Sequence, residues 1–583
     1  MMPGSDLVRS RMGGAPRTLA RGRWSVEVRG DEVADIRFDG VHLLRAIRPV
    51  VRDRDWNTVP VAVVSQHLTD ADATLVTRLR FETDGIAYEA TTRLRLHDDE
   101  LTVDFDGRAL VDFERNRIGL VVLHPAADAG RAVRVKHTDG GLTTGSWPTH
   151  ISPHQPFRDV AGFEWRKDGV TATLSLSGDV FETEDQRNWT DASFKTYSTP
   201  LSLPFPVAVP AGADCHQHLR LAADGRAESG AGPSTEELTV SSTVAGVLPP
   251  VSLGASLYPP PARPLDGLAA YETVLVELVG EEERWPDQLR SAARQADALT
   301  AHLDVRVVTA EPDAIGRCVA QLAGLPVARL GVFDRDSHVS APALWGALRD
   351  SVRRHGFTGQ LVAGTRAHFT ELNRNIHQIP EDADALTFSV TPQMHATEIP
   401  HLIDSLAMQR IVAENARRLG GGRPVLVGPV TLARRFNAVA TTAAPDPAVD
   451  ALRAIDPLQP TDFTAAWTLG SVASLAAAGV AGVCYFETGG PRGIVTSDQT
   501  VTPAGKVLNR IARLRGRPVL RCTAPDGIAA LAVLLDGGSV ELAVANLSAT
   551  ARTITVGGPG RRPIPVDLDG WSVHHATLDA PVD

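Results

Sequence analysis

The chain has 583 residues, of which 43% are hydrophobic and 22% are charged, and its formal net charge is −11. This length exceeds what one hydrophobic core usually serves, so about three domains of ordinary globular composition are expected. The negative charge is modest and no Lys/Arg run stands out, which argues against a nucleic-acid partner. A small neutral or polar substrate fits this charge better than a polyanion.

The N-terminal segment and the cysteines indicate a cytoplasmic protein. Residues 1–19 lack an apolar core of signal-peptide length and are expected to form a flexible N-terminus. The longest apolar run, 470–486, is typical of a buried helix followed by a strand, not of a membrane span. The four cysteines are scattered without a CxxC pair, so neither a disulfide framework nor a structural zinc site is expected.

Residues 20–245 predict an N-terminal antiparallel β-sandwich. Apolar residues alternate with others over 75–81, 88–96 and 101–105. The first two of these runs are separated by Asp84-Gly85, a hairpin turn signal. Period-two alternation between turn signals is the pattern of strands with one buried face. Residues 223–236 are small and polar, and indicate a surface loop or linker.

Residues 246–516 predict a (β/α)8 TIM barrel. Short apolar runs alternate there with stretches of helical spacing, and eight such units match the barrel in number and length. A doubly wound sheet is the competing topology, but no GxGxxG turn supports it. The expected strands are 252–257, 273–278, 305–310, 328–333, 360–364, 385–390, 424–430 and 480–486.

Residues 517–583 predict a small C-terminal β-sandwich, because apolar strand patterns return at 528–535, 540–546 and 553–556. The predicted architecture is therefore multidomain α/β plus β, with a central barrel flanked by two β domains.

Catalytic groups of a barrel gather just after the C-terminal ends of its strands. Glu371 follows the fifth expected strand, His395 the sixth and Glu487 the eighth. Two carboxylates at one mouth can divide acid and base work when their environments separate their pKa values. The alternative is that each glutamate is a rim carboxylate paired with Arg374 or Arg492, and that His395 is structural.

Two groups of residues are predicted to bind substrate. Asn373, Arg374 and Gln393 lie beside the expected catalytic positions. The second group lies in residues 181–197 of the N-terminal domain, where charges, amides and aromatic rings are densely mixed, as suits the recognition of sugar hydroxyls. Its members are Asp185, Arg187, Asn188 and Trp189. The alternative for this segment is a well-packed interdomain loop.

The sequence carries no pattern for a metal or another cofactor, and none is expected. His216 and His218 share one face of a probable strand, but no third ligand is evident nearby. Neither a GxSxG elbow nor an HExxH motif is present, so a serine α/β-hydrolase and a zincin are both unsupported.

Four segments resemble the D-apionate lactonase family: EDQRNWTDASFKTY at 184–197, RNRIG at 115–119 with LHP at 123–125, SPHQPF at 152–157, and FTELNR at 369–374. The resemblance extends over almost the whole chain and its order of domains. It implies that the chain opens D-apionolactone with water to give D-apionate, in the catabolism of apiose. The implied partner is a small sugar-acid lactone, and the oligomeric state stays open.

The sequence leaves three mechanisms open. In a lactonase, Glu371 or Glu487 would deprotonate water, Asn373 or Arg374 would stabilise the oxyanion, and the other glutamate or His395 would protonate the departing oxygen. In a retaining glycoside hydrolase of the barrel type, Glu371 would be the acid/base and Glu487 the nucleophile, although Thr370 stands where such enzymes usually have Asn. A non-catalytic sugar-binding protein is the third possibility.

Overall fold

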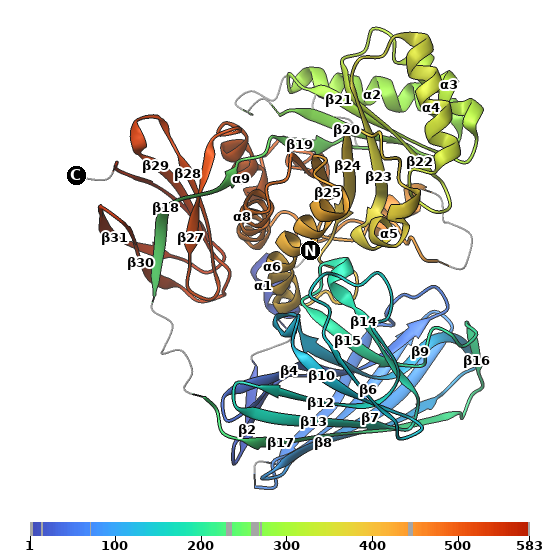
Figure 1. Ribbon diagram of the computed structural model, residues 1–583, viewed down its shortest axis with the longest axis vertical. Helices are drawn as coiled ribbons and strands as arrows, with labels where there is room; N and C mark the ends of the chain where they lie inside the picture. The colour runs from blue at the N-terminus through green and yellow to red at the C-terminus, as the bar shows by residue number, and fades with distance from the viewer. Residues whose placement is uncertain are drawn as a thin grey trace.

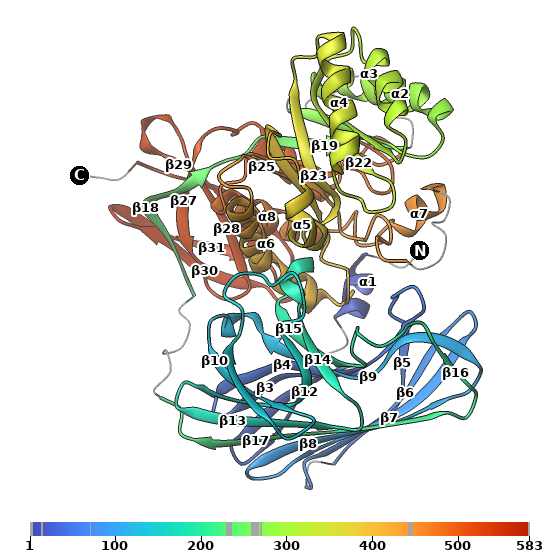
Figure 2. The same cartoon turned by 45° about the vertical axis from the view of Figure 1, so that its right-hand side comes forward.

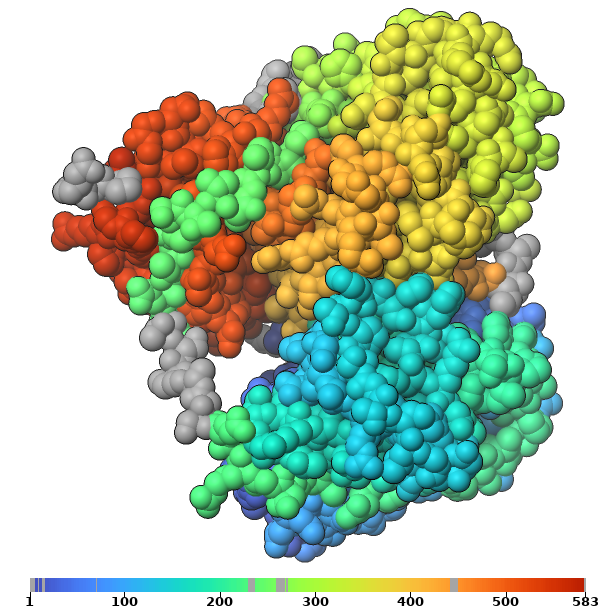
Figure 3. All heavy atoms as spheres, in the orientation of Figure 1, coloured from blue at the N-terminus to red at the C-terminus, as the bar shows by residue number. Residues whose placement is uncertain are grey.

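The computed structural model describes residues 4–12, 16–69, 71–228, 236–257, 268, 271–440 and 447–580. Figure 1 shows three bodies: a β domain, a barrel surrounded by helices, and a second, smaller β sheet beside the barrel. The N-terminal β domain lies directly against the barrel, as the space-filling view in Figure 3 also shows.

The N-terminal domain consists of seventeen strands in one hydrogen-bonded system, and every pairing within it is antiparallel. Its burial alternates as the sequence pattern predicts: Leu75 pairs with Leu94 and Leu79 with Ala90, and all four are buried. Its strands are β1 (Arg17–Arg21), β2 (Trp24–Arg29), β3 (Glu32–Phe38), β4 (Val41–Asp53), β5 (Val61–Thr69), β6 (Thr74–Thr83), β7 (Ile86–Leu96), β8 (Glu100–Ala109), β9 (Phe113–Pro125), β10 (Ala132–His137), β11 (Leu142–Ser146), β12 (Phe157–Lys167), β13 (Val170–Ser177), β14 (Phe181–Asp185), β15 (Ser193–Ser198), β16 (Val207–Val209) and β17 (Asp214–Gly225).

The TIM barrel is confirmed, since eight parallel strands close into one barrel. Each expected strand segment overlaps an observed strand. The strands are β19 (Val251–Gly254), β20 (Thr273–Leu278), β21 (His302–Thr309), β22 (Val327–Asp334), β23 (Gln360–His368), β24 (Ala385–Val390), β25 (Val425–Val430) and β26 (Gly482–Glu487). Parallel barrel strands are covered on both faces, which explains why they appear in the sequence as short continuous apolar runs.

Helices surround this barrel. They are α2 (Trp285–Ala298), α3 (Pro312–Gln321), α4 (Pro342–His355), α5 (Phe369–Asn375), α6 (Ile399–Leu419), α7 (Pro447–Arg453), α8 (Asp462–Ala477) and α9 (Pro503–Ala512). Proline near the first position helps to start α2, α3, α4, α6 and α9. Most residues between β19 and β20 lie outside the described part of the chain. No helix among the described residues has the length and apolar character needed to cross a bilayer.

The C-terminal sheet has seven strands, in the order β31-β30-β18-β27-β28-β29-β32. Six follow the barrel in the chain: β27 (Pro518–Thr523), β28 (Ile528–Leu534), β29 (Val540–Asn546), β30 (Arg552–Gly558), β31 (Arg561–Leu568) and β32 (Val573–Leu578). The seventh, β18 (Glu237–Val247), precedes the barrel and corrects the boundary predicted near residue 245. Leu238 and Val240 of β18 pack in the C-terminal core. Alternation identifies a strand but not the sheet it joins, which is why the sequence placed β18 in the N-terminal domain.

The N-terminus also differs from the expectation of a flexible segment. Residues Gly4–Arg11 form the helix α1, and Arg17–Arg21 form β1. Val8 of α1 is buried in the barrel core, and Arg11 donates to Asp456 at 3.0 Å. The segment is too short to show a periodic pattern by itself, but its few apolar residues are ordered by packing against the barrel.

Candidate active site

A cavity of about 370 Å³ lies between the N-terminal domain and the barrel. Strands β4, β9, β14 and β15 form one side of it, and the segments after β23, β24 and β25 form the other. Figure 2 shows the β14–β15 region of the N-terminal domain meeting the barrel near α5 and α6. The cavity therefore exists only because two domains with separate cores pack together.

A histidine and an aspartate meet in the cavity wall from opposite domains. His395 follows β24 of the barrel, and its Nδ1 lies 2.7 Å from an Asp191 carboxylate oxygen. Only 18% of the His395 side chain is exposed. Burial lowers the pKa of His395, although Asp191 opposes this shift, so the imidazole is neutral at pH 7. A carboxylate oxygen beside Nδ1 favours the tautomer that carries its proton on Nδ1, in which Nε2 is a hydrogen-bond acceptor.

The chain presents Asp191 through a short 3-10 turn, η2 (Gln186–Trp189), between β14 and β15. The Asp185 carboxylate accepts the backbone N–H of Arg187 at the start of η2. Thr190 ends the turn in the left-handed conformation, with φ 67°, and its hydroxyl donates to the Thr391 carbonyl of the barrel at 3.2 Å. Asp191 is thus held toward the loop that carries His395.

Two arginines that form no ion pair within the described part of the chain add positive charge to the cavity. Arg52 of β4 donates to the Trp56 carbonyl at 3.1 Å, and Arg434 of the barrel donates to the Asn57 side-chain oxygen at 2.8 Å. Among the described residues, neither has a carboxylate within 4.0 Å. Burial is the main cause that lowers the pKa of Arg52 to about 10. The charges of Glu184 and Asp191 oppose this shift, and those of Arg48 and Arg434 add to it. Both guanidinium groups remain charged at pH 7, and a bound anion would relieve their repulsion.

The turn after β4 positions both arginines. Asp53 closes it by accepting the backbone N–H groups of Asp55 and Asn57, each at 2.8 Å. Consecutive residues of this turn, Trp56 and Asn57, then hold Arg52 from the N-terminal domain and Arg434 from the barrel. A single local turn therefore brings two cations from different domains to one cavity.

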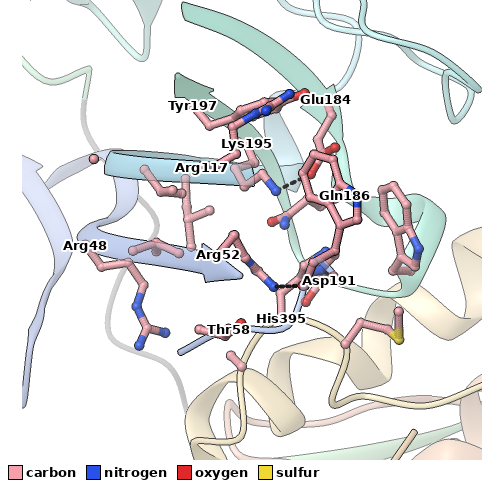
Figure 4. Close-up of a pocket in the computed structure, with 18 of the residues that line it drawn as sticks. Arg48, Arg52, Thr58, Arg117, Glu184, Gln186, Asp191, Lys195, Tyr197 and His395 are labelled. Carbon is pink, nitrogen blue, oxygen red and sulfur yellow. Dashed lines mark hydrogen bonds and ion pairs between the residues drawn. The ribbon is translucent and has the colours of Figure 1, made fainter. Parts of the chain in front are cut away.

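A second ion pair, between Lys195 and Glu184, lies on the strand side of the cavity, as Figure 4 shows. These residues pair across β14 and β15. Burial lowers the pKa of Lys195 despite Glu184, while the charges of Lys195 and then His395 outweigh the effect of burial and lower the pKa of Glu184. Glu184 is therefore ionised at neutral pH, next to Lys195.

Aromatic rings form another part of the wall. The guanidinium of Arg117 lies 4.9 Å from the centre of the Trp56 ring, and the rings of Tyr197 and Phe205 are also within 6 Å. These four residues line the cavity together. Flat rings next to hydrogen-bonding groups suit a sugar-sized ligand.

The two predicted catalytic glutamates lie outside this wall. Glu371 is the third residue of α5, and burial raises its pKa to about 7, although the backbone N–H groups of Glu371 and His368 oppose the shift. A glutamate at this position commonly caps the start of its helix. Glu487 ends β26, pairs with Arg492, and has a pKa that burial also raises to about 7. The rim pairing considered for Glu487 is therefore observed.

Four of the predicted substrate-binding residues, Asp185, Arg187, Asn188 and Asn373, do not line the cavity. Asp185 and Arg187 form an ion pair at 2.7 Å whose side chains are at most 1% exposed. The Asn188 side chain accepts from Asn373 of α5 at 2.9 Å, and Asn373 also donates to the Ile151 carbonyl. The Asn188–Asn373 hydrogen bond joins the two domains, as in the alternative of a well-packed interdomain loop, whereas the Asp185–Arg187 ion pair lies within the N-terminal domain. None of the contacts described for these residues is with a residue side chain that would place them against a ligand in the cavity.

Trp189 and Arg374 line the cavity, and their role as substrate-binding residues stays a prediction. The Arg374 guanidinium lies 5.4 Å from the Trp189 ring centre, and the ring is edge-on to His395 at 5.3 Å. Gln393 is outside the wall, where it contacts Asp456 and Arg11. Among the expected residues, the structure thus brings together His395, Trp189 and Arg374.

Sequence reasoning missed Asp191, Glu184 and Lys195 as individual residues, although it singled out the segment that contains them. Arg52 and Arg434 were missed entirely, because an isolated arginine in a strand or loop carries no pattern. Among the described residues, no cluster of three or more His, Cys, Asp or Glu side chains could hold a metal ion.

The described residues combine a His–Asp pair, several cations and aromatic rings in one cavity beside a TIM barrel, an arrangement that suits an enzyme. Models of D-apionate lactonase match residues 7–226 as its N-terminal domain and residues 263–516 as its TIM barrel domain. The chain belongs to the D-apionate lactonase family, as its motifs predicted. A D-apionate lactonase of Brucella anthropi is 28% identical over 530 residues, which cover 84% of this chain and 85% of that protein.

Solved structures with similarity to this chain include two glycoside hydrolases. A GH30 endoxylanase from Clostridium papyrosolvens C71 has 9% identity and a TM-score of 0.42, over 59% of this chain and 100% of that one. A GH51 arabinofuranosidase from Xanthomonas axonopodis pv. citri has 12% identity and a TM-score of 0.40, over 59% of this chain and 97% of that one.

Proposed function

We propose that this chain hydrolyses D-apionolactone to D-apionate in the interdomain cavity. The family assignment and the name of the Brucella anthropi relative support the reaction. The observation that carries the proposal is the His395–Asp191 pair in the wall of a cavity that several cations line. Nε2 of His395 has no hydrogen-bond partner among the described residues. Lactone opening needs a base for water and cations for a developing oxyanion, and it produces an anion.

His395 is the base in this mechanism. Its Nε2 takes a proton from a water molecule while the water oxygen attacks the lactone carbonyl carbon. Asp191 holds the imidazole and stabilises the imidazolium that forms. The negative charge that develops on the carbonyl oxygen is stabilised by Arg52 and Arg434, which face the same cavity.

The intermediate then collapses. The bond between the carbonyl carbon and the ring oxygen breaks, and the imidazolium returns its proton to that oxygen as it leaves. The product is a hydroxy acid, which ionises at neutral pH. Its carboxylate remains beside Arg52 and Arg434. His395 replaces Glu371 and Glu487 as the proposed base, because neither glutamate lines the cavity.

The cavity does not favour a glycoside hydrolase. That chemistry needs two carboxyl groups on one site, about 5 Å apart for retention or more than about 6.5 Å apart for inversion. The carboxylates that line this cavity, Glu184 and Asp191, are each engaged by a cation or an imidazole. A free nucleophilic carboxylate is therefore lacking among the described lining residues.

The test is to incubate the purified chain with D-apionolactone and follow D-apionate by NMR, with 4-nitrophenyl glycosides as a parallel panel. We expect ring opening well above the spontaneous rate and no release of nitrophenol. Glycoside cleavage without lactone opening would overturn the proposal.

A further inference from the structure

The Lys195–Glu184 pair has no part in the hydrolysis described above, yet it lines the same cavity as His395. The Lys195 side chain is 13% exposed and that of Glu184 is 12% exposed. Burying two charges is costly and is not by itself a reliable source of stability. An ion pair kept in a cavity wall, and not inside a core, is available to a ligand.

Lys195 and His395 are close enough to influence each other. Burial is the main cause of the lowered pKa of His395, and the positive charges of Lys195 and Arg52 add to it. His395 in turn contributes to the low pKa of Glu184, the partner of Lys195. Figure 4 shows Lys195 and Glu184 on the strands of the N-terminal domain and His395 on the barrel loop. One proton donor and one proton acceptor thus face the cavity from different domains.

The chemistry of Lys195 differs from that of the surrounding arginines. A guanidinium keeps its proton in proteins, whereas an ammonium group can release one when its surroundings disfavour the charge. Burial has this effect on Lys195, and Arg52 adds to it. Among the cations that line the cavity, Lys195 is therefore suited to donate a proton and recover it.

We propose that the cavity has a second activity, the interconversion of the anomers of small furanose aldoses, with His395 as base and Lys195 as acid. The proposal rests on the ability of the cavity to accept a five-membered sugar ring, as in the proposed lactonase function. A lactone and a furanose hemiacetal share this ring. They differ at the carbon next to the ring oxygen. In the lactone this carbon carries a carbonyl oxygen, and in the furanose it is the anomeric carbon, which carries a hydrogen and a hydroxyl group.

The proton balance of the step is complete without water or a cofactor. His395 Nε2 removes the proton of the anomeric hydroxyl, and the C–O bond of that group becomes a carbonyl. The bond between the anomeric carbon and the ring oxygen breaks, and Lys195 gives its proton to the ring oxygen. After rotation about the adjacent C–C bond, both proton transfers run backwards and the ring closes on the other face of the carbonyl.

The experiment measures the exchange between the anomers of D-apiose and of D-ribose by NMR saturation transfer, with and without the enzyme. D-apionolactone hydrolysis is assayed on the same preparation. The variant Lys195→Arg keeps a cation beside Glu184 but cannot donate its proton. If Lys195→Arg fails to fold, the double variant Glu184→Gln/Lys195→Met replaces it. This double variant removes both charges and therefore leaves no unpaired buried ion.

We expect wild-type enzyme to raise the exchange rate at least tenfold over buffer on one of the two aldoses, and Lys195→Arg and His395→Gln each to abolish this gain. No acceleration by a preparation that opens the lactone would overturn the second activity and leave the lactonase intact. Equal acceleration by wild type and by a folded Lys195→Arg would overturn the role of Lys195. A preparation that accelerates exchange but does not open the lactone would support this inference and contradict the proposed function.

Discussion

Replacing His395 with Gln should remove the proposed base while preserving most of the side-chain volume. General acid–base catalysis contributes about 10²–10⁴-fold, and His395 acts both as base and as acid, so kcat should fall by at least about 10²-fold. Asp191→Asn should also lower kcat, because an amide can donate to Nδ1 and stabilise the tautomer that carries its proton on Nε2. Initial rates of D-apionolactone opening, followed by NMR at pH 7, measure both effects.

His216 provides a matched control. Its Nδ1 lies 2.7 Å from Asp106, the same distance as in the His395–Asp191 pair, but the His216 side chain is 68% exposed on β17. His216→Gln should leave kcat near the wild-type value. The reasoning would be refuted if His395→Gln remained within about twofold of wild type while Glu371→Gln or Glu487→Gln lost activity, because a carboxylate outside the described cavity would then be the base.

Three further predictions follow from the same site. Arg52→Met should remove a charge-assisted hydrogen bond to the substrate of about 1.5–3 kcal/mol and so lower kcat/KM by roughly 10- to 150-fold. The same variant should bind D-apionate more weakly, as measured by calorimetry. Unchanged affinity for D-apionate would contradict this role of Arg52. The acid limb of kcat/KM should have its midpoint below pH 6.5, because neutral His395 is the active form and burial lowers its pKa, whereas Glu371 or Glu487 as base would place the midpoint near pH 7. Glu371→Gln should have a larger free energy of unfolding than wild type at pH 8, and this difference should be about 3 kcal/mol smaller at pH 4.5, as measured by urea unfolding. The pKa of Glu371 rises from 4.5 to about 7 on folding, so the wild type loses stability as the pH rises between these values. A difference independent of pH would be inconsistent with this shift.

The sequence predicted the barrel well because strand identity is a local property. The runs at 273–278 and 385–390 coincide with β20 and β24 in their bounds. Strands buried on both faces must be apolar along their length, and the helices between them must keep a helical spacing. The same locality explains the error at β18, since alternation is equally present in a strand of either β domain.

The candidate site could be predicted only in part from local sequence patterns. The segment 184–197 stood out by composition, but its side chains divide between two faces. Glu184 and Asp185 are neighbours, and successive residues of a strand point in opposite directions. Glu184 therefore lines the cavity while Asp185 is buried with Arg187. The register of β14 against β15, and the turn between them, decided which residues line the cavity.

The sequence by itself determined the order of the domains, the barrel strands, the family and the distinctive segment, because these depend on periodicity and on motifs of neighbouring residues. Only the tertiary structure decided that the cavity lies between two domains. Arg52 and Arg434 come from different domains and are joined through Trp56 and Asn57 of one turn. Nδ1 of His395, the proposed base, lies 2.7 Å from the carboxylate of Asp191 in the other domain. No local pattern encodes such distances, because they are set by how two separately folded cores pack together.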